Sequence, residues 1–509
     1  MRPRLIVATL LTTTLSVGAL AACSSTDPGV AVGRSRAGND APLITDPTTD
    51  STTGTSTDNP TNTSTQRTVP DSIPVEDGVI NFGDNKPAHD YDGFMVAMFK
   101  DVEAFWAKYF PDLYDEAFEP LSGGIYAAYP QRTDPIPGCG TRTTSYDDVE
   151  MNAFYCSVGD FMAYDDAKLI PELVDNLGQS SVGIVLAHEF GHAVQKRAGN
   201  WAQPVVLKEQ QADCFAGAWA GHIARGENPD FAFTDNEVRA GMIALIQVAD
   251  PVELSGQGDP NAHGTGFDRV GAFQDGFVGG PQRCKTFFEE NRQSKMIDIR
   301  FIDEPNAGNL PIKDPNGKGD DILTLIPEDL TTFWTGLLEA QGKTFNAPAI
   351  ESYPGRGPYP SCKGVDDTAY KGNAVYCVQN NTIYYDADNA QKLTQRIGDM
   401  ALGYLLANGF SDAAQVSLGS PLTGERRILA DDCLTGAWVA DIVPDDTGTA
   451  KGGRQLRLSA GDLDEAIQTA IINADPTSDT NINGSAFEKV DTFRAGVLGG
   501  LAACMERFG

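Results

Sequence analysis

An internal repeat constrains the fold of this 509-residue chain more than any other feature. Four short segments of the first half recur in the same order about 220 residues later. The matched segments are residues 101–106 and 329–334, 152–156 and 373–377, 212–219 and 431–438, and 267–284 and 487–504. Because each copy is long enough to bury a core of its own, the sequence predicts two domains with one common fold.

The first copy contains the motif His188-Glu189-Phe190-Gly191-His192. Two histidines four residues apart lie on one face of a helix, so both imidazoles can bind the same zinc ion. Glu189 lies beside the position that an attacking water would take. The motif therefore predicts a hydrolytic zinc site in which Glu189 is the general base.

A second motif, Glu209-Gln-Gln-Ala-Asp213, follows on the next stretch of helical sequence. A catalytic zinc ion takes three protein ligands and keeps one open position, and Glu209 is the best third ligand after the two histidines. Asp213 lies one turn further, where its carboxylate can hold the distal N–H of a ligand histidine. The cofactor predicted by these residues is one Zn²⁺ ion. The alternatives are ordinary buried histidines beside a solvated Glu209, or a structural zinc site whose fourth side chain is not evident nearby.

Helix signals surround both motifs. Ser181 is predicted to cap the first helix, and Gly199 is placed to end it. Pro204 is predicted to open the second helix. Gly191 is expected to leave space next to the metal.

Residues 187–195, 209–219 and 263–269 resemble the bacterial putative neutral zinc metallopeptidase family, and the resemblance covers roughly residues 95–290. Among zinc peptidases the chain is similar to the gluzincins, in which a glutamate of a second helix is the third ligand. The metzincin pattern would need glycine and histidine where this chain has Gln195 and Ala198. The resemblance implies a zinc peptidase acting on peptide or protein substrates.

The resemblance also suggests a role for His263, because gluzincins commonly use a downstream histidine to stabilise the oxyanion of the tetrahedral intermediate. The alternative is an ordinary loop histidine, and Arg269 is a competitor for the same role. His89 and His222 are expected to be ordinary polar residues.

The second copy lacks every residue of the predicted metal site. The first-copy residues and their second-copy counterparts are His188 and Asn408, Glu189 and Gly409, His192 and Asp412, Glu209 and Ile428, and His263 and Asn483. Asp432 and Trp438 are nevertheless retained, so their counterparts Asp213 and Trp219 are expected to serve the fold as well. The second copy is predicted to be a degenerate pseudopeptidase that packs against the first, binds a partner or substrate, or both.

The N-terminus has the pattern of a bacterial lipoprotein signal. Arg2 and Arg4 precede an apolar stretch that ends in Leu-Ala-Ala-Cys23. This pattern predicts a signal peptide over residues 1–22, lipid attachment at Cys23, and an exported chain anchored to the outer face of the cytoplasmic membrane; a plain secretory signal is the alternative. Residues 23–75, rich in Thr, Ser, Pro and Asp, are predicted to form a disordered tether.

Eight of the nine cysteines divide four and four between the copies. Pairing within each copy leaves three connectivities, and export makes disulfides chemically reasonable, although buried free thiols are the alternative. The favoured pairs are Cys139–Cys156, Cys214–Cys284, Cys362–Cys377 and Cys433–Cys504.

Charge excludes one class of partner. The chain has 38 basic and 70 acidic residues and a formal net charge of −32, so no phosphate-binding stripe is available and a nucleic-acid partner is not expected. 

The fold class predicted for each copy is α+β, mainly helical with a small antiparallel sheet that includes strands near 154–156 and 161–164. The predicted domains are a zinc metallopeptidase domain over 76–305 and a degenerate repeat over 306–509. In the resembled fold class a strand near the active helix pairs with extended peptide. We therefore expect a zinc-dependent endopeptidase. The alternative is an envelope binding or scaffold lipoprotein with a vestigial or structural zinc site, against which the intact Glu189 argues.

Overall fold

The computed structural model describes most of the chain beyond residue 67. The described residues are 30–31, 68–70, 73–76, 78–140, 142–249, 264–289, 292, 296–297, 299, 308–445, 454–474 and 485–509. Residues 1–22, Cys23, His263 and Asn483 lie outside this set, and so does almost all of the predicted tether.

The two halves contain the same elements in the same order, and both are α+β as predicted. The first half consists of α1 (Asp92–Tyr114), β2 (Gly124–Ala128), β3 (Ala153–Cys156), β4 (Phe161–Asp165), α2 (Leu169–Leu177), α3 (Gln179–Arg197), α4 (Val205–Ala224), α5 (Asp235–Gln247) and α6 (Gly266–Lys285). The second half consists of α7 (Ile322–Glu339), β5 (Ala349–Tyr353), β6 (Ala374–Cys377), β7 (Thr382–Asp386), α8 (Ala387–Arg396), α9 (Asp399–Leu418), α10 (Gly424–Ile442), α11 (Asp462–Ile472) and α12 (Ala486–Phe508). Descent of both halves from one duplicated domain stays a prediction.

Each half has a small mixed sheet. β3 pairs antiparallel with β4, as expected, but β2 pairs with β4 in parallel, and the order β5-β7-β6 repeats this arrangement. The prediction of an antiparallel sheet was therefore incomplete, because a parallel partner from an earlier segment leaves no local turn signal. The other edge of β3 carries β1 (Val30–Ala31), which pairs antiparallel at Tyr155 and Phe154.

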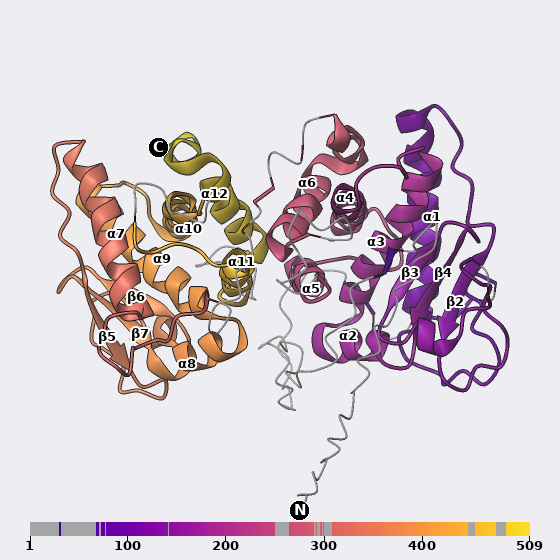
Figure 1. The fold of residues 1–509 in the computed structure, drawn as a ribbon, viewed down its shortest axis with the longest axis horizontal. Helices are drawn as coiled ribbons and strands as arrows, with labels where there is room; N and C mark the ends of the chain where they lie inside the picture. The colour runs from indigo at the N-terminus through magenta and orange to yellow at the C-terminus, as the bar shows by residue number, and fades with distance from the viewer. Residues whose placement is uncertain are drawn as a thin grey trace, which may run out of the picture.

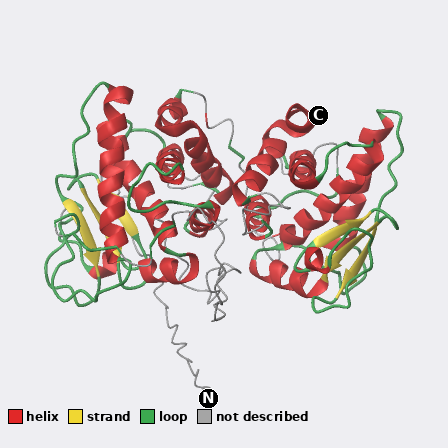
Figure 2. Cartoon of the chain, turned by 180° about the vertical axis from the view of Figure 1, so that it is seen from behind, coloured by secondary structure: helices red, strands yellow, loops and turns green. Residues whose placement is uncertain are grey.

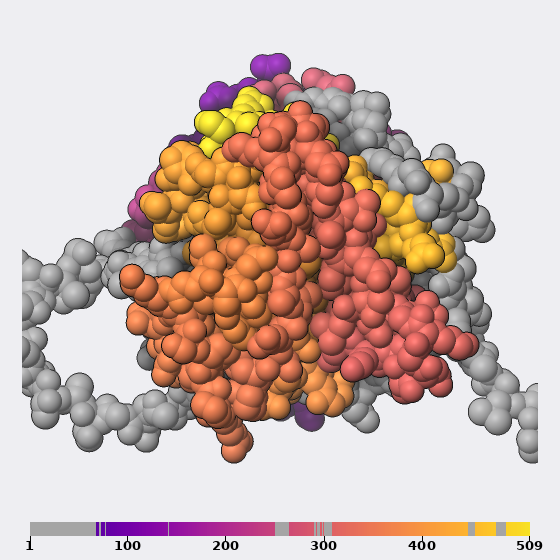
Figure 3. Space-filling model, turned by 90° about the vertical axis from the view of Figure 1, so that its left-hand side faces the viewer, coloured from indigo at the N-terminus to yellow at the C-terminus, as the bar shows by residue number. Residues whose placement is uncertain are grey.

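The halves lie side by side with their sheets at the outer ends of the molecule. Figures 1 and 2 show α5 and α6 facing α11 and α12 across the middle. In that contact the rings of Phe277 and Phe487 have centroids 4.9 Å apart, and Gln274 Nε2 donates to the Phe487 carbonyl at 2.9 Å. Seen from its own end, the second half covers most of the first (Figure 3).

Close helix contacts bring the metal motifs together. A Cβ atom on Gly191 would lie 3.1 Å from the Ala212 Cα, so this glycine permits α3 and α4 to approach each other. The expectation that Gly191 clears space at the metal is therefore replaced by a packing role. Gly217 permits the same approach of α4 to α6, because its Cβ would lie 2.0 Å from the Phe273 carbonyl oxygen.

The helix ends agree with the sequence in two of three places. α4 has Pro204 as its N-cap, and Gly199, with φ of 74°, follows the end of α3. α3, however, begins at Gln179 after Gly178, so Ser181 is not its cap. Ser181 lies in the first turn, where its hydroxyl donates to the Gly178 carbonyl at 2.7 Å.

All four favoured disulfides are present. Cys139–Cys156 and Cys362–Cys377 tie each sheet to its preceding loop, with Cα atoms 5.6 and 5.9 Å apart. Cys214–Cys284 and Cys433–Cys504 join α4 to α6 and α10 to α12. Among the helices described, none has the length and apolar character needed to cross a bilayer.

Candidate metal centre

The predicted ligands meet between two packed helices. α3 supplies His188 and His192, and α4 supplies Glu209. Each of the three side chains is at most 1% exposed. Glu189 lies close to the two histidines. His188, Glu189 and His192 each offer one atom that could bind a metal, and these three atoms lie within 4.8 Å of one another.

The geometry of these side chains fits a zinc ion. His188 Nε2 lies 3.3 Å from Glu209 Oε2, and His192 Nε2 lies 3.5 Å from Glu209 Oε1. Metal–ligand bonds of about 2.0–2.2 Å at tetrahedral angles separate neighbouring ligand atoms by about 3.3–3.6 Å. Both histidine Nε2 atoms are buried without a hydrogen-bond partner in the described structure, which is costly unless an ion binds them.

Both ligand histidines are oriented through their other ring nitrogen. His188 Nδ1 lies 2.7 Å from Asp213 Oδ1, the contact expected from the sequence, and His192 Nδ1 lies 2.9 Å from Gln195 Oε1. The Gln195 amide in turn donates to the Lys208 carbonyl at 2.6 Å. These contacts aim both Nε2 atoms at the centre. Sequence reasoning missed Gln195, although its position three residues after His192 on the same helix face was a usable signal.

Glu189 is held by strand β3 of the sheet. Its Oε2 accepts a hydrogen bond from the Tyr155 backbone N–H in β3 at 3.1 Å, and its Oε1 has no hydrogen-bond partner among the described residues. Burial raises the pKa of this carboxyl well above its ordinary value. One oxygen is thus fixed and the other is available for proton transfer. The role of the Tyr155 backbone could not be read from residue types.

The surroundings shift the pKa values of the two ligand histidines in opposite directions. Burial lowers the pKa of His192 to about 4, so this imidazole is neutral and ready to bind metal. Burial also opposes a charge on His188, but the carboxylates of Asp213 and Glu209 together outweigh it and raise the pKa to about 10. Burial disfavours the Asp213 charge as well, yet Arg269 and His188 hold its pKa below the usual value. A metal ion must therefore displace a proton from His188.

Arg269 is engaged by Asp213. Its Nε and Nη2 donate to the two carboxylate oxygens at 2.9 and 3.0 Å, its Nη1 donates to the Val248 carbonyl, and the residue is 1% exposed. The expectation that Arg269 competes with His263 for an oxyanion is not supported, since the guanidinium supports the carboxylate behind His188. His222 lies by Phe105 and Glu227 and His89 stacks on Tyr91, both away from the centre.

Comparisons with known proteins identify a similar family and several relatives. Residues 82–287 match the family model described as "Putative neutral zinc metallopeptidase". The uncharacterized protein Rv2575 of Mycobacterium tuberculosis is 29% identical over 219 residues, which cover 38% of this chain and 69% of the relative. The uncharacterized protein YpfJ of Escherichia coli K12 is 32% identical over 174 residues, which cover 30% of this chain and 57% of the relative.

No solved structure matches the chain. The match at 82–287 includes both helices of the metal centre and ends just after α6, before the first helix of the second half begins at Ile322. Over residues 82–287 the chain is therefore similar to the putative neutral zinc metallopeptidase family.

Proposed function

We propose that the chain is a zinc-dependent peptidase whose ligands are His188, His192 and Glu209 and whose general base is Glu189. The observation that carries this proposal is the free Oε1 of Glu189 beside a ligand set of zinc dimensions. A structural zinc site or a scaffold protein would gain nothing from a buried carboxylate oxygen without a partner. The family match supports the same chemistry.

Zinc, when bound, would lower the pKa of water and polarise the substrate carbonyl. Glu189 would take the proton of the attacking water through Oε1 while Tyr155 N–H holds Oε2 in place. The same carboxyl would then return the proton to the leaving amine. Asp213 would keep the His188 imidazole in the tautomer that presents Nε2 to the metal. His263 remains the candidate for stabilising the oxyanion.

The edge of β3 supports a peptide substrate. This edge lies beside Glu189 and already pairs antiparallel with the short strand β1. An extended peptide could pair with β3 in the place of β1, with backbone hydrogen bonds placing one peptide bond over the centre. We infer an endopeptidase, because a peptide that pairs with a strand is held by its backbone on both sides of the scissile bond.

The proposal includes export and lipid anchoring at Cys23, on the basis of the N-terminal sequence. Four disulfides within the described residues support an oxidising compartment.

The test is cleavage of an unfolded protein mixture by the zinc-loaded chain, compared with Glu189→Gln. The variant should keep its zinc and lose at least about 100-fold of the activity, because it lacks the base. Glu116→Gln, the same chemical change at an exposed residue, should retain full activity. No cleavage by the zinc-loaded wild type would overturn the proposal in favour of a binding protein.

A further inference from the structure

A carboxylate of the second half reaches the start of the helix that supports the metal centre. Asp464 on α11 accepts hydrogen bonds from the backbone N–H groups of Gly266 at 2.9 Å and Phe267 at 2.7 Å. The third N–H of α6, that of Asp268, donates to the Thr265 hydroxyl at 3.1 Å. The first turn of α6 is therefore satisfied mainly by a residue some two hundred positions later in the chain.

This contact fits the chemistry of a helix N-terminus. The first N–H groups of a helix have no partner within the helix, and an anion there also interacts favourably with the helix dipole. Gly266 allows the approach, because a Cβ at this position would lie only 3.2 Å from the Asp464 carboxyl carbon and oxygen. Both partners of the contact are thus shaped for it, a carboxylate on one half and a glycine on the other.

α6 transmits this contact to a metal ligand. Arg269 lies one turn after Gly266 and donates to both carboxylate oxygens of Asp213 at 2.9 and 3.0 Å. Asp213 Oδ1 lies 2.7 Å from His188 Nδ1. Arg269 and Asp213 are at most 1% exposed, so neither can adjust into solvent if α6 shifts. An unbroken series of contacts runs from the second half to His188.

The contact is not a symmetric feature of two similar halves. The N-cap box of α5 pairs Thr234 with Glu237, and the corresponding pair before α11 is Ser459 with Asp462. Alignment on these boxes puts Arg239 of the first half opposite Asp464. Arg239 instead donates to the Ile471 carbonyl at 3.1 Å. At this aligned position the second half has an anionic side chain, Asp464, and the first half has a cationic one, Arg239. This difference indicates that each half is specialised for its contact with the other.

We propose that Asp464 is a positioning residue for the metal centre, and that the second half serves the first by fixing the start of α6 and hence Arg269, Asp213 and His188. The proposal rests on the proposed function in that it assigns the centre to metal binding. It does not require that the chain cleaves peptides.

The test uses the full chain and two variants that break the contact from opposite sides, Asp464→Asn and Gly266→Ala. In Asp464→Asn, the side-chain amide directs an N–H group at one of the two backbone N–H donors and so cannot accept its hydrogen bond. In Gly266→Ala, the added methyl group pushes the Asp464 carboxylate away from both donors. Outer partners of metal ligands typically contribute 10–100-fold to metal affinity, and Asp464 acts two contacts further out. We expect zinc affinity, measured by competition with a chelator, to fall roughly three- to tenfold in both variants. Amide hydrogen exchange over 266–269 should become faster.

The matched control is Gln274→Ala, which removes the hydrogen bonds of Gln274 to the Phe487 carbonyl and to Arg494 of the second half and leaves the contact of Asp464 with the N–H groups of Gly266 and Phe267 in place. Its zinc affinity should equal that of the wild type. An equal loss in Gln274→Ala, or unchanged zinc affinity in Asp464→Asn with native melting behaviour, would overturn the proposal. If the wild type bound zinc and cleaved nothing, these readouts would still decide the role of Asp464. The proposed peptidase function alone would then fail.

Discussion

The metal centre of the first half and its counterpart in the second half share a framework and differ in their ligands. Asn408 stands opposite His188, and its Nδ2 donates to Asp432 Oδ1 at 3.0 Å, as His188 Nδ1 contacts Asp213. Lys489 Nζ, 2.8 Å from Asp432 Oδ2, takes the place of Arg269. The buried carboxylate with its cation thus persists where the histidine is lost.

The remaining ligand positions of the second half carry one partner of an ion pair and an apolar residue. Asp412, opposite His192, is paired with Arg427, and Ile428 stands where the first half has Glu209. The amide of Gln415 still donates to the Arg427 carbonyl at 3.0 Å, as Gln195 does to Lys208. The two halves therefore build the same helix framework with different side chains at the ligand positions.

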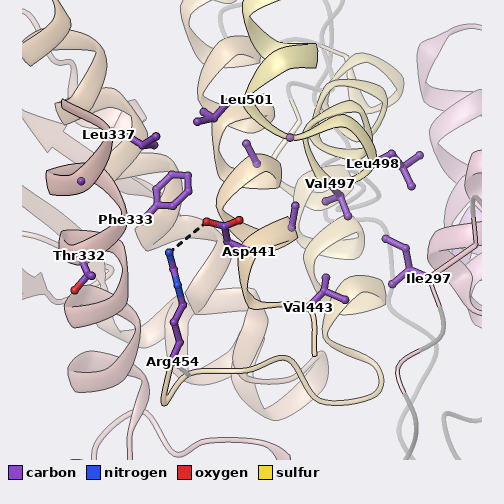
Figure 4. Close-up of a pocket in the computed structure, with 14 residues that line it drawn as sticks. Ile297, Thr332, Phe333, Leu337, Asp441, Val443, Arg454, Val497, Leu498 and Leu501 are labelled. Atoms are coloured by element: carbon purple, nitrogen blue, oxygen red, sulfur yellow. Dashed lines mark hydrogen bonds and ion pairs between the residues drawn. The ribbon is translucent and has the colours of Figure 1, made fainter. Parts of the chain in front are cut away.

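The two halves also differ in how they fill one space beside this framework. A cavity of about 560 Å³ opens in the second half between α7, α10 and α12, and Figure 4 shows its lining, which includes Leu337, Asp441 and Val497. By alignment of the repeats, the first half has the larger rings of Tyr109, His222 and Phe277 at these positions. The cavity is therefore lined by smaller side chains than those at the aligned positions of the first half.

The largest difference in zinc affinity is expected between substitutions at equivalent ligand positions of the two halves. His192→Ala should reduce zinc affinity by more than the 10–100-fold typical of losing an outer partner, because a direct ligand is lost. Asp412→Ala, at the corresponding position of the second half, should leave zinc affinity unchanged. Chelator competition on both variants checks this. A loss of affinity in Asp412→Ala would break the distinction between the halves.

The helix-joining disulfides should contribute equally to the two halves. Cys214–Cys284 and Cys433–Cys504 close loops with sequence separations of 70 and 71 residues. Loops of this length correspond to about 4 kcal/mol of stabilisation when the disulfide constrains the unfolded chain. Chemical denaturation of the two double Cys→Ala variants should show similar losses, each in its own half. Markedly unequal losses would mean that the shared framework is not equally stable.

Substitution of Asp213 should affect zinc affinity, whereas substitution of its counterpart Asp432 should affect only stability. Asp213→Asn should lower zinc affinity about 10–100-fold, because His188 loses the carboxylate that orients it. Asp432→Asn leaves Lys489 buried without its carboxylate and should cost about 3 kcal/mol of stability, with zinc affinity unchanged. Zinc titration and denaturation of both variants provide the comparison. An effect of Asp432→Asn on zinc affinity would contradict it.

The smallest effect concerns a buried acidic group of the second half. Burial, then the charges of Asp462 and Asp399, raise the pKa of Glu465 well above its ordinary value, and the first half has Ala240 at this position. Above the unfolded pKa the native state holds the extra proton, so stability falls as pH rises toward the raised pKa. Glu465→Gln removes this dependence. The difference in stability between the variant and the wild type should therefore depend on pH. From pH 5 to pH 8 it should shift in favour of the variant by about 1 kcal/mol, or roughly 2–4 °C in melting temperature. A variant with the same pH dependence as the wild type would show that Glu465 titrates normally.

The sequence predicted the parts of this site that depend on local spacing. Residues four apart on a helix must share a face, so His188 and His192 and the contact of Asp213 behind His188 followed from the motifs. The disulfides followed from the repeat, because equivalent cysteines must lie at equivalent places.

The parts that were missed depend on contacts between distant segments. The parallel pairing of β2 with β4, the Tyr155 N–H that holds Glu189, and the reach of Asp464 to α6 join positions whose proximity only the fold determines. Ser181 was given the wrong role because a glycine with positive φ, Gly178, can start a helix without a side-chain cap.

The most direct test of the account is a crystal structure of the full chain with zinc, solved with anomalous data at the zinc absorption edge. We expect one strong anomalous peak per chain, about 2.0–2.2 Å from His188 Nε2, His192 Nε2 and a Glu209 oxygen. No peak should appear between Asn408 and Asp412. A peak that lacks any one of the three ligands, or a second zinc ion in the corresponding place of the second half, would contradict the account.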